Sequence, residues 1–457
     1  MAEHTISLVK SLKKLLDDKK YQTLKDILTT MNGADIAAVF EEMDEERTPL
    51  LFRLLPKELA AETFAELSPE LQEHLIRGFS DKELREVVSE LYVDDAADLV
   101  EEMPASVVKR ILAQADPQMR REINEILRYP ENSAGSIMTT EYVSLRPNMT
   151  IAEALQRIRR TGVDKETIYT CYVTKERRLI GTVSVKDMLL APDENTPVSE
   201  IMDENVISVN TLTDQEEVAQ MLSKYNFLAL PVVDTDGRMV GIVTFDDAID
   251  VLVEETTEDI EKMAGMLPSE KTYLRSTPWD LFKHRIPWLL LLMVSATFTG
   301  MIITRFESAL AAQVVLTAFI PMLMDTGGNS GSQASVTVIR ALSLGELELR
   351  DLPKVVWKEV QTAVLCGVAL ATLCFAKIMV FDRMILGNTD ITVMTAFVVC
   401  LTMAVTVLVA KVVGCTLPLF AKKLGFDPAV MASPFITTIV DALSLLVYFG
   451  IASALLF

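Results

Sequence analysis

Histidine and cysteine are scarce in this sequence of 457 residues. It contains three histidines and five cysteines, and no pair of them has metal-ligand or redox spacing. The odd number of cysteines argues against a disulfide framework, so we expect a reducing compartment around the soluble part. No nucleophile is paired with a histidine, and no glycine-rich loop carries a P-loop lysine. The sequence therefore predicts a protein that is not an enzyme.

Basic residues are also too few to balance the acidic ones, because 43 Lys and Arg face 64 Asp and Glu. Residues 281–457 hold 10 of the acidic and 12 of the basic residues, so residues 1–280 hold 54 and 31 and carry a net charge of −23. Such an acidic part disfavours nucleic acid and anionic lipid as partners and favours cations, although a solvated, solubilising surface is the alternative. The first residues, MAEHTISLVKSLKK, lack the apolar core of a signal peptide, and we expect this part to be cytoplasmic.

Residues 1–135 show apolar residues at helical spacing with a break about every twelve residues. The breaks lie near Pro56, Pro69, Asp81, Asp94, Pro104 and Pro117. Ser80 and Glu83 form a capping box, and Pro69 follows Ser68 as a first-turn proline follows its cap. The spacing predicts an N-terminal helical domain built as a superhelical stack, with a generic helical interaction domain as the alternative.

The next region repeats internally. Ile137 and Met138 recur as Ile201 and Met202, and IGTVSVKDML recurs as VGIVTFDDAI. Each copy alternates β-rich runs with amphipathic helices, and the pair resembles a tandem of CBS domains, here 136–198 and 199–253.

In the CBS family the Ser/Thr and Asp of a G-x-x-[ST]-x-x-D pattern hold a nucleotide's phosphate and ribose. The matching residues are Gly181, Ser184 and Asp187 in the first copy and Gly241, Thr244 and Asp247 in the second. A hydroxyl donates to phosphate and a carboxylate accepts from ribose hydroxyls. Binding of ATP is therefore a hypothesis, and a pair that binds no nucleotide is the alternative.

An acidic helix is expected from about 246 to 264, ending at Gly265, and we assign 254–278 as the acidic connecting helix. Its carboxylates follow at spacings of three and four residues: Asp247, Asp250, Glu254 and Glu258, with Glu255 and Asp259 on the adjoining face. Like charges at these spacings repel by a few tenths of a kcal/mol per pair. Magnesium or calcium would neutralise them, and solvation alone is the alternative.

Residues 279–457 are predicted to form a transmembrane pore domain with five helical spans. The spans are 286–304, 310–342, 355–381, 391–417 and 428–456. Eight basic residues fall in the inner flanks and loops and two in the outer loops, which puts the N-terminus in the cytoplasm and the C-terminus outside. Lys377, Lys411 and Asp382 lie nearer span ends and are expected to snorkel.

Two of these spans carry acids in apolar surroundings. Asp441 lies in the fifth span, where a carboxylate needs a partner, a cavity or an ion. Pro434 removes a backbone donor one to two turns earlier, which can free a carbonyl. In the second span Asp325 lies in a glycine-rich stretch that is too polar to face lipid, although close helix packing is the alternative for its glycines. The expected pore-lining residues are Asp325, Asn329, Ser330, Gln333, Thr437 and Thr438.

The order of these parts resembles the MgtE family of magnesium channels or transporters. The resemblance is carried by ENSAGSIMTTEYVSL, the CBS pair, EETTEDIEKMAG, GGNSGSQ and DPAVMASPFITTIVDALS. It implies a homodimer in the cell membrane with a pore on its two-fold axis, in which Asp441 coordinates hydrated magnesium. It also implies regulatory magnesium sites, which map onto Asp247, Asp250, Glu255, Glu258 and Asp259. Ser433 departs from the family pattern, where glycine is expected.

The sequence is thus interpreted as a multidomain Mg²⁺ channel or transporter that cytoplasmic Mg²⁺ closes and ATP modulates. The expected partners are Mg²⁺, membrane lipid, a second copy of the chain and ATP, with no nucleic acid. One alternative is a less selective path for Co²⁺, Ni²⁺ or Mn²⁺, since carboxylates and waters suit several ions. Another is a nucleotide sensor whose membrane part only anchors it.

Overall fold

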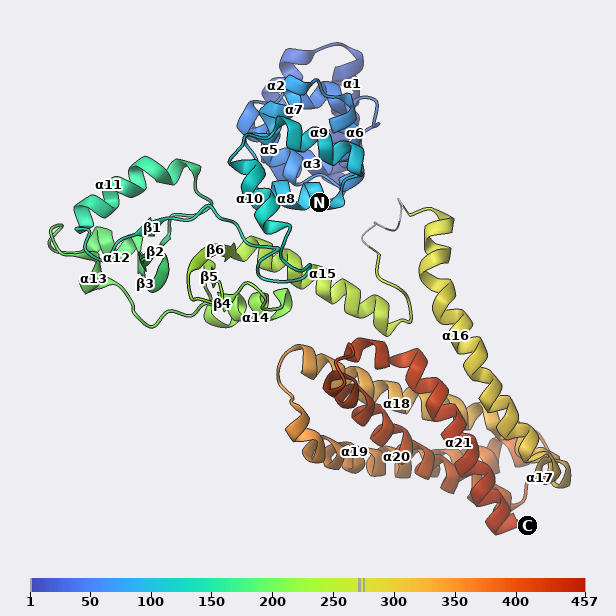
Figure 1. The fold of residues 1–457 in the computed structure, drawn as a ribbon. Helices are drawn as coiled ribbons and strands as arrows, with labels where there is room; N and C mark the ends of the chain where they lie inside the picture. The colour runs from blue at the N-terminus through green and yellow to red at the C-terminus, as the bar shows by residue number, and fades with distance from the viewer. Residues whose placement is uncertain (1, 270–272, 274–275, 457) are drawn as a thin grey trace. The chain divides into compact units, whose positions relative to one another are not determined.

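The computed structural model describes residues 2–269, 273 and 276–456. The chain forms two compact units, Met1–Leu252 and Val253–Phe457, which are described separately below (Figure 1). Helix α15 (Phe245–Met263) runs across the boundary between them.

The first unit begins with a stack of short helices. They are α1 (Ala2–Asp17), α2 (Tyr21–Leu28), α3 (Gly33–Glu41), α4 (Thr48–Phe52), α5 (Lys57–Ala65), α6 (Pro69–Gly78), α7 (Asp81–Val88), α8 (Val93–Glu102), α9 (Ala105–Gln114) and α10 (Met119–Ile126). Alternate helices pack on one another, α3 on α5, α5 on α7 and α7 on α9. Ser80 and Glu83 form the predicted capping box at the start of α7, which confirms that prediction. This alternating contact is the pattern of a superhelical stack.

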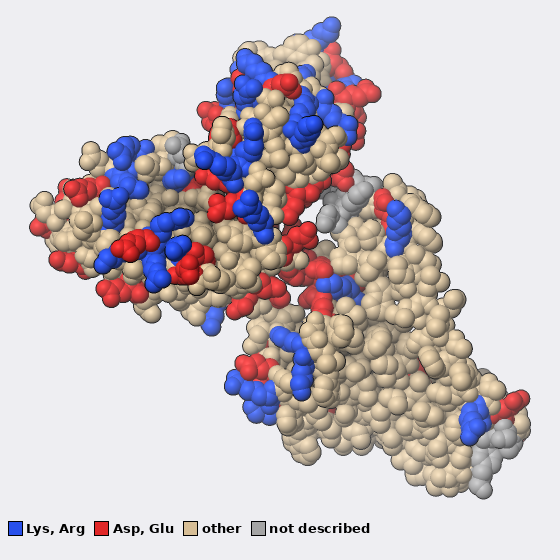
Figure 2. All heavy atoms as spheres, in the orientation of Figure 1, with Lys and Arg blue, Asp and Glu red and all other residues tan. Residues whose placement is uncertain are grey.

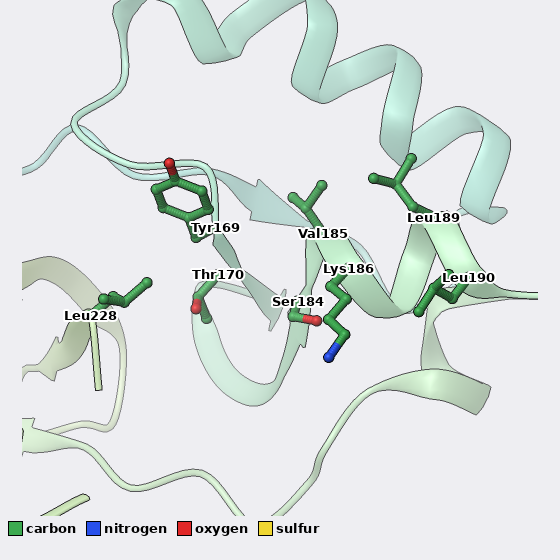
Figure 3. A pocket seen from close by; sticks show the side chains of 8 residues that line it. All are labelled: Tyr169, Thr170, Ser184, Val185, Lys186, Leu189, Leu190 and Leu228. Atoms are coloured by element: carbon green, nitrogen blue, oxygen red, sulfur yellow. The ribbon is translucent and has the colours of Figure 1, made fainter. Parts of the chain in front are cut away.

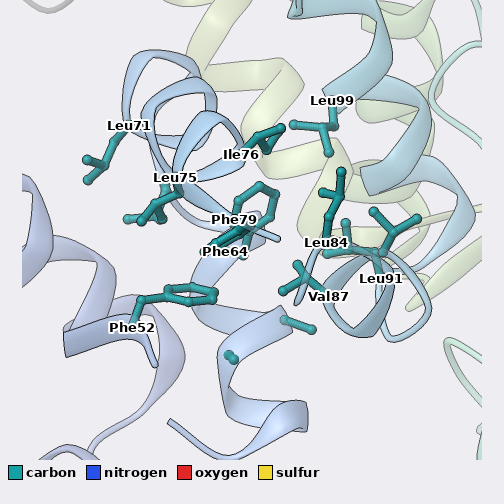
Figure 4. Close-up of a cluster of buried hydrophobic side chains, with 14 of the residues drawn as sticks. Phe52, Phe64, Leu71, Leu75, Ile76, Phe79, Leu84, Val87, Leu91 and Leu99 are labelled. Atoms are coloured by element: carbon teal, nitrogen blue, oxygen red, sulfur yellow. The ribbon is translucent and has the colours of Figure 1, made fainter. Parts of the chain in front are cut away.

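Three aromatic rings hold the middle of this stack together (Figure 4). The ring centroid of Phe52 lies 6.1 Å from that of Phe64 and 5.3 Å from that of Phe79, and all three side chains are buried. Each ring comes from a different helix or helix end, so no single helix can leave without exposing a large apolar surface. Helix α8, which bears several acidic residues, belongs to the same packed core through its buried side chains such as Leu99.

Two small sheets of the same topology follow. In the first, β1 (Ser144–Leu145) pairs parallel with β2 (Thr170–Lys175), which pairs antiparallel with β3 (Arg178–Ser184). In the second, β4 (Val209–Asn210), β5 (Ala229–Val233) and β6 (Met239–Thr244) repeat this order. The accompanying helices are α11 (Ile151–Thr161), η1 (Gly162–Asp164), α12 (Val185–Leu190), α13 (Val198–Ile201) and α14 (Gln215–Tyr225). The repeated order confirms the duplication seen in the sequence.

Each sheet is completed by the first segment of the other repeat. A Cβ added at Gly241 would lie 2.7 Å from the sulfur of Met138, and one at Gly181 would lie 2.6 Å from that of Met202. Backbone bridges join Thr139 to Ile242 and Thr182 to Asp203 beside these contacts. The Ile-Met pair and the glycine recur in both copies because they meet across the two repeats.

The second unit is helical. It contains α16 (Pro278–Arg305), α17 (Glu307–Ala312), η2 (Val314–Phe319), α18 (Ile320–Ser343), η3 (Leu349–Asp351), α19 (Leu352–Lys377), η4 (Ile378–Ile385), α20 (Val393–Lys423), η5 (Pro428–Met431) and α21 (Ser433–Leu456). Four segments of the described residues are long and apolar enough to cross a membrane: Pro278–Arg305, Leu349–Ile385, Val393–Lys423 and Pro428–Leu456. Helix α18 packs against α20 and α21 (Figure 1).

The second span, predicted over 310–342 with an interruption at residues 321–335, is divided at a different place, before residue 320. This region forms α17, η2 and α18, and Pro321 lies in the first turn of α18. Proline has no N–H and fits the first turn of a helix but not its interior, so a new helix starts there. At about 1.5 Å per residue α18 is about 36 Å long, which is enough to cross a membrane. Because it contains many polar residues, it is not one of the four apolar segments given above. For this reason a total of five spans stays a prediction.

The helical part of the connecting segment predicted over 254–278 ends at Met263. Gly265 follows with a φ of +71°, the left-handed conformation that ends a helix and favours glycine. Residues 270–272, 274 and 275 of this segment lie outside the described residues.

Candidate cation and nucleotide sites

The glycines of α18 bring it close to its neighbouring helices. A Cβ added at Gly327 would lie 2.7 Å from Ser444 Oγ, and one at Gly331 would lie 2.8 Å from the Ile436 side chain. Gly414 of α20 meets the backbone carbonyl of Gly331. These glycines therefore serve helix packing, the alternative considered for them above.

The polar side chains of α18 lie on a different face from the glycines. Asp325, Asn329 and Gln333 follow at four-residue spacing and are exposed, and we call them the α18 polar stripe. Asn329 Nδ2 donates to Asp325 Oδ1 at 3.0 Å. Ser330, expected in the same lining, is instead buried. An exposed polar stripe in an apolar helical unit needs water, an ion or another protein surface beside it.

Asp441 lies half-buried on α21, which packs so closely against α18 that a Cβ added at Gly328 would lie 3.0 Å from the Thr437 side chain. The hydroxyls of Thr437 and Thr438 both donate to the carbonyl of Pro434 at 3.0 Å, so this carbonyl has hydroxyl partners. The two predicted acids thus lie on helices that pack together, with hydroxyl groups one turn from Asp441 on α21.

Lys411 does not snorkel, contrary to the prediction. Its side chain is only 6% exposed, and its Nζ lies 3.6 Å from Glu359 Oε2 of α19. Lysine can reach water only from a helix face and depth that are open to it, and this face of α20 packs on α19. The sequence did not reveal this ion pair, because Lys411 and Glu359 are 52 positions apart. Lys377 and Asp382 pair at 2.7 Å near the end of α19.

Within the second unit, the end of α15 contacts the segment that leads into α21. Lys262 Nζ lies 2.5 Å from Glu258 Oε1 and 2.6 Å from Asp427 Oδ2. Burial opposes the charge of Lys262, but its hydrogen bonds to these carboxylates prevail and raise its pKa. Ser343 Oγ of α18 donates to Asp259 Oδ2 at 3.3 Å. Glu258, expected as a magnesium ligand, is thus neutralised by a lysine.

Within the first unit, acids from three places crowd together. Asp94 and Asp95 lie on α8, Asp247 lies on α15, and Glu166 lies in the segment before β2. Burial, followed by the charge of Asp247, raises the pKa of Asp94 well above its usual range, that of Asp95 to about 6 and that of Glu166 to about 8. The charges that act on these carboxylates are all negative, which leaves their repulsion uncompensated.

Sequence reasoning found Asp247 in this group and missed the others. The run VDDAADLVEE of α8 has the acid density that could have revealed Asp94 and Asp95, but Glu166 has no such signal. Asp250 is exposed and Glu255 half-buried on α15. In the described part of the chain, no three His, Cys, Asp or Glu side chains already converge on one metal position. Among the described residues, these acidic side chains therefore do not form a preorganised metal site.

A cavity of about 540 Å³ lies against the first CBS repeat, with Leu228 of the second repeat on one wall (Figure 3). It is lined by Tyr169, Thr170, Ser184, Val185, Lys186, Leu189, Leu190 and Leu228. Ser184 Oγ donates to Asp187 Oδ2 at 2.6 Å and accepts from the Asp187 backbone N–H at 3.0 Å, which caps α12. Thr244 of the second copy is buried and donates to Asp247. Lys186 supplies a cation and Tyr169 an aromatic face, both suited to a nucleotide.

Charge is distributed very differently over the two units. The visible face of the second unit is mostly uncharged, and its Lys, Arg, Asp and Glu gather toward its ends (Figure 2). Together with the four apolar segments and the duplicated sheets, this defines a multi-pass membrane protein with a CBS-type pair of repeats.

Three family models match the chain: "MgtE intracellular N domain" over residues 31–132, "CBS domain" over 134–194 and 198–254, and MgtE, "Divalent cation transporter", over 320–451. The magnesium transporter MgtE of Thermus thermophilus is 38% identical over 454 residues, covering 98% of both chains. That of Bacillus subtilis is 32% identical, covering 96% of this chain and 95% of its own.

A solved structure, the cytosolic domain of the Mg²⁺ channel MgtE in complex with ATP, is 41% identical with a TM-score of 0.51, over 53% of this chain and 99% of that one. The soluble part of a magnesium transporter matches at 30% identity and the same TM-score, over 55% of this chain and 99% of that one. The chain belongs to the MgtE family of magnesium transporters.

Proposed function

We propose that this chain is a magnesium-selective channel or transporter that imports Mg²⁺ across the cell membrane. The observation that carries the proposal is the α18 polar stripe, on a helix that packs against the Asp441-bearing α21, in a largely apolar unit. Magnesium gives up water reluctantly and is held by few carboxylates, so amides and acids along one helix face suit a hydrated ion. One Asp441 per chain favours a homodimer, in which a two-fold axis pairs the acids.

Replacing Asp441 tests this proposal. We expect Asp441→Asn to lower Mg²⁺ influx into proteoliposomes by at least tenfold, because the amide keeps the shape and removes the charge. Asp390→Asn, at an exposed position outside the helices, is the matched control and should retain flux. Undiminished influx in Asp441→Asn would rule out the assigned path. Competition by Co²⁺, Ni²⁺ and Mn²⁺ in the same assay separates a selective path from a general divalent one.

We propose further that cytoplasmic Mg²⁺ closes the path by binding the acidic residues of the first unit and of α15. The support is the crowd of negative charge around Asp247, which a divalent cation would relieve. The N-terminus then lies in the cytoplasm and the C-terminus outside. Asp95→Asn with Asp247→Asn should shift the inhibition of influx to higher internal Mg²⁺, whereas Asp26→Asn on exposed α2 should not. An unshifted inhibition curve would contradict this regulatory role.

ATP is the proposed nucleotide of the cavity around Ser184, since a relative's cytosolic domain is described in complex with ATP. Calorimetry should show at least tenfold weaker ATP binding for Lys186→Met, because the one basic side chain of the lining is lost. Ser199→Ala, outside the lining, is the control. ATP binding by a protein that supports no Mg²⁺ influx into proteoliposomes, with or without Asp441→Asn, would favour the membrane-anchored nucleotide sensor instead.

A further inference from the structure

The ion pair of Lys411 with Glu359 lies deep in the apolar part of the second unit. The two side chains are 6% and 15% exposed, and Lys411 Nζ lies 3.6 Å from Glu359 Oε2. This oxygen is buried and accepts no hydrogen bond in the described part of the chain. Lys411 precedes Lys423, the last residue of α20, by 12 residues or about 18 Å of helix. The pair is therefore far from the water at the end of this apolar segment.

The same stretch of α20 contacts α18 at the level of the α18 polar stripe. A Cβ added at Gly331 would lie 3.2 Å from the carbonyl oxygen of Ala410, the residue before Lys411. Gly331 is buried and lies between Asn329 and Gln333, which belong to the stripe and are exposed. Helix α20 also packs against α19, which carries the glutamate. The ion pair thus lies behind α18, at the depth where the stripe lies on the other face of this helix.

Helix packing alone does not account for charges at this place. Two apolar side chains of similar size would join α19 to α20 about as well, because the cost of burying two charges offsets most of their attraction. A buried charge also acts at a distance, since salt screens it less than a surface charge. The effect of the pair on a cation beside the stripe therefore has to be considered.

The size of that effect follows from the thickness of the helices. Two helix diameters, or roughly 20 Å, separate the far side of α20 from the exposed side of α18. At this distance and an effective dielectric constant of about 20, one unit charge changes the binding constant of a dication on the order of tenfold. The charge of Lys411 without its partner would weaken cation binding by this factor. A carboxylate 3.6 Å away cancels most of it.

We propose that Glu359 sustains the cation affinity of the magnesium path by cancelling the charge of Lys411. This inference rests on the proposed function, because it takes the α18 polar stripe and Asp441 as the path. Glu359 acts through Lys411 and is a positioning residue, not a ligand of the ion. Coulomb energy scales with the charge of the ion, so the cancellation favours a dication twice as strongly as a monovalent ion. The pair thereby contributes to selection of divalent cations.

Mg²⁺ influx into proteoliposomes that hold the full-length protein and no internal Mg²⁺ tests the proposal. Glu359→Gln leaves the charge of Lys411 uncancelled and should raise the KM for Mg²⁺ about threefold to tenfold. Lys411→Gln leaves the charge of Glu359 and should lower the KM by a similar factor. Both amides can still form a hydrogen bond to the remaining partner, which limits misfolding. The uncharged double variant should return the KM to within about twofold of the parent value.

The opposite signs separate this role from a structural one. A loss of folded protein lowers the maximal rate in either variant and leaves the KM unchanged. Lys411→Arg with Glu359→Gln is a second test, because a guanidinium stays charged in a protein interior, and its KM should rise at least as much as that of Glu359→Gln. Lys358→Gln, on the exposed side of α19 next to Glu359, is the matched control and should keep the parent KM.

Unchanged KM values in both single variants, or shifts in the same direction, would overturn the proposal. Asp441→Asn in the same assay distinguishes this failure from that of the path itself. Influx that falls in Asp441→Asn while Glu359→Gln keeps the parent KM removes only the role of Glu359. Undiminished influx in Asp441→Asn removes both proposals.

Discussion

Charged side chains with restricted access to solvent are arranged in opposite ways in the two units. In the second unit Lys411 pairs with Glu359, and Lys262 lies between Glu258 and Asp427 and pairs with both. In the first unit the charges that act on Asp94, Asp95 and Glu166 are all negative, and that of Asp247 is among them. Paired charges hold a structure in place, whereas crowded like charges make its stability depend on a cation. Removing a charge should therefore destabilise one unit and stabilise the other.

The largest effect is expected where a paired charge is broken. Lys411→Met leaves Glu359 buried without a partner, because this carboxylate oxygen has no hydrogen-bond donor in the described part of the chain. The free energy of unfolding should fall by about 3 to 5 kcal/mol. Thermal unfolding of the protein in detergent micelles measures the change.

The double variant Lys411→Met with Glu359→Met is the control for this prediction. It should recover most of the lost stability, since replacing both members of a buried pair by apolar residues is close to neutral. A double variant as unstable as the single one would show that shape, not charge pairing, matters at this contact.

A smaller effect should follow from adding one methyl group between α18 and α20. In Gly414→Ala the new Cβ meets the carbonyl of Gly331, which has no flexible end to move aside. Overpacking of this kind costs about 1 to 3 kcal/mol. Gly300→Ala and Gly450→Ala are matched helical controls, because a Cβ there meets nothing within 4 Å, and these should be neutral or slightly stabilising. If Gly414→Ala, Gly300→Ala and Gly450→Ala all unfolded at the same temperature, the tight packing of α18 against α20 would be contradicted.

Local signals in the sequence predicted local structure well. The Ser80–Glu83 capping box and the repeated β-β pattern depend on neighbours within a few residues, and both are confirmed. The second span was predicted over 310–342 with an interruption at residues 321–335. The chain is instead helical from Ile320 to Ser343 and the break lies before Pro321, because hydropathy does not register that this proline fits the first turn of a new helix. The ion pair of Lys411 with Glu359 and the repulsion between Asp95 and Asp247 involve positions far apart in the sequence, which only the tertiary packing brings together. The positions of single acids were thus predictable, but their partners were not.

The smallest effect, of opposite sign, is expected in the first unit. Asp95→Asn removes a carboxylate. Burial, followed by the charge of Asp247, raises the pKa of this carboxyl from 3.8 to about 6. Each pKa unit corresponds to about 1.4 kcal/mol, and partial solvent screening reduces the total, so a gain of about 1 to 2 kcal/mol is expected at pH 8 without divalent cations. Glu70→Gln, on exposed surface of α6, should leave stability unchanged.

The same raised pKa values fix the sign of the pH dependence. Between about pH 4 and pH 8 the folded acids bind more protons than the unfolded ones, so the free energy of unfolding falls as the pH rises through the values of about 6 for Asp95 and 8 for Glu166. The free energy of unfolding is thus greatest at the acidic end of this range. An ion-paired carboxylate, whose pKa is lowered, would have the opposite effect and lose its stabilisation as the pH falls. Added Mg²⁺ should raise the unfolding temperature more at pH 8 than at pH 6, because protons compete for the same oxygens. A Mg²⁺ effect that is equal at both pH values would show that these carboxylates do not bind the ion.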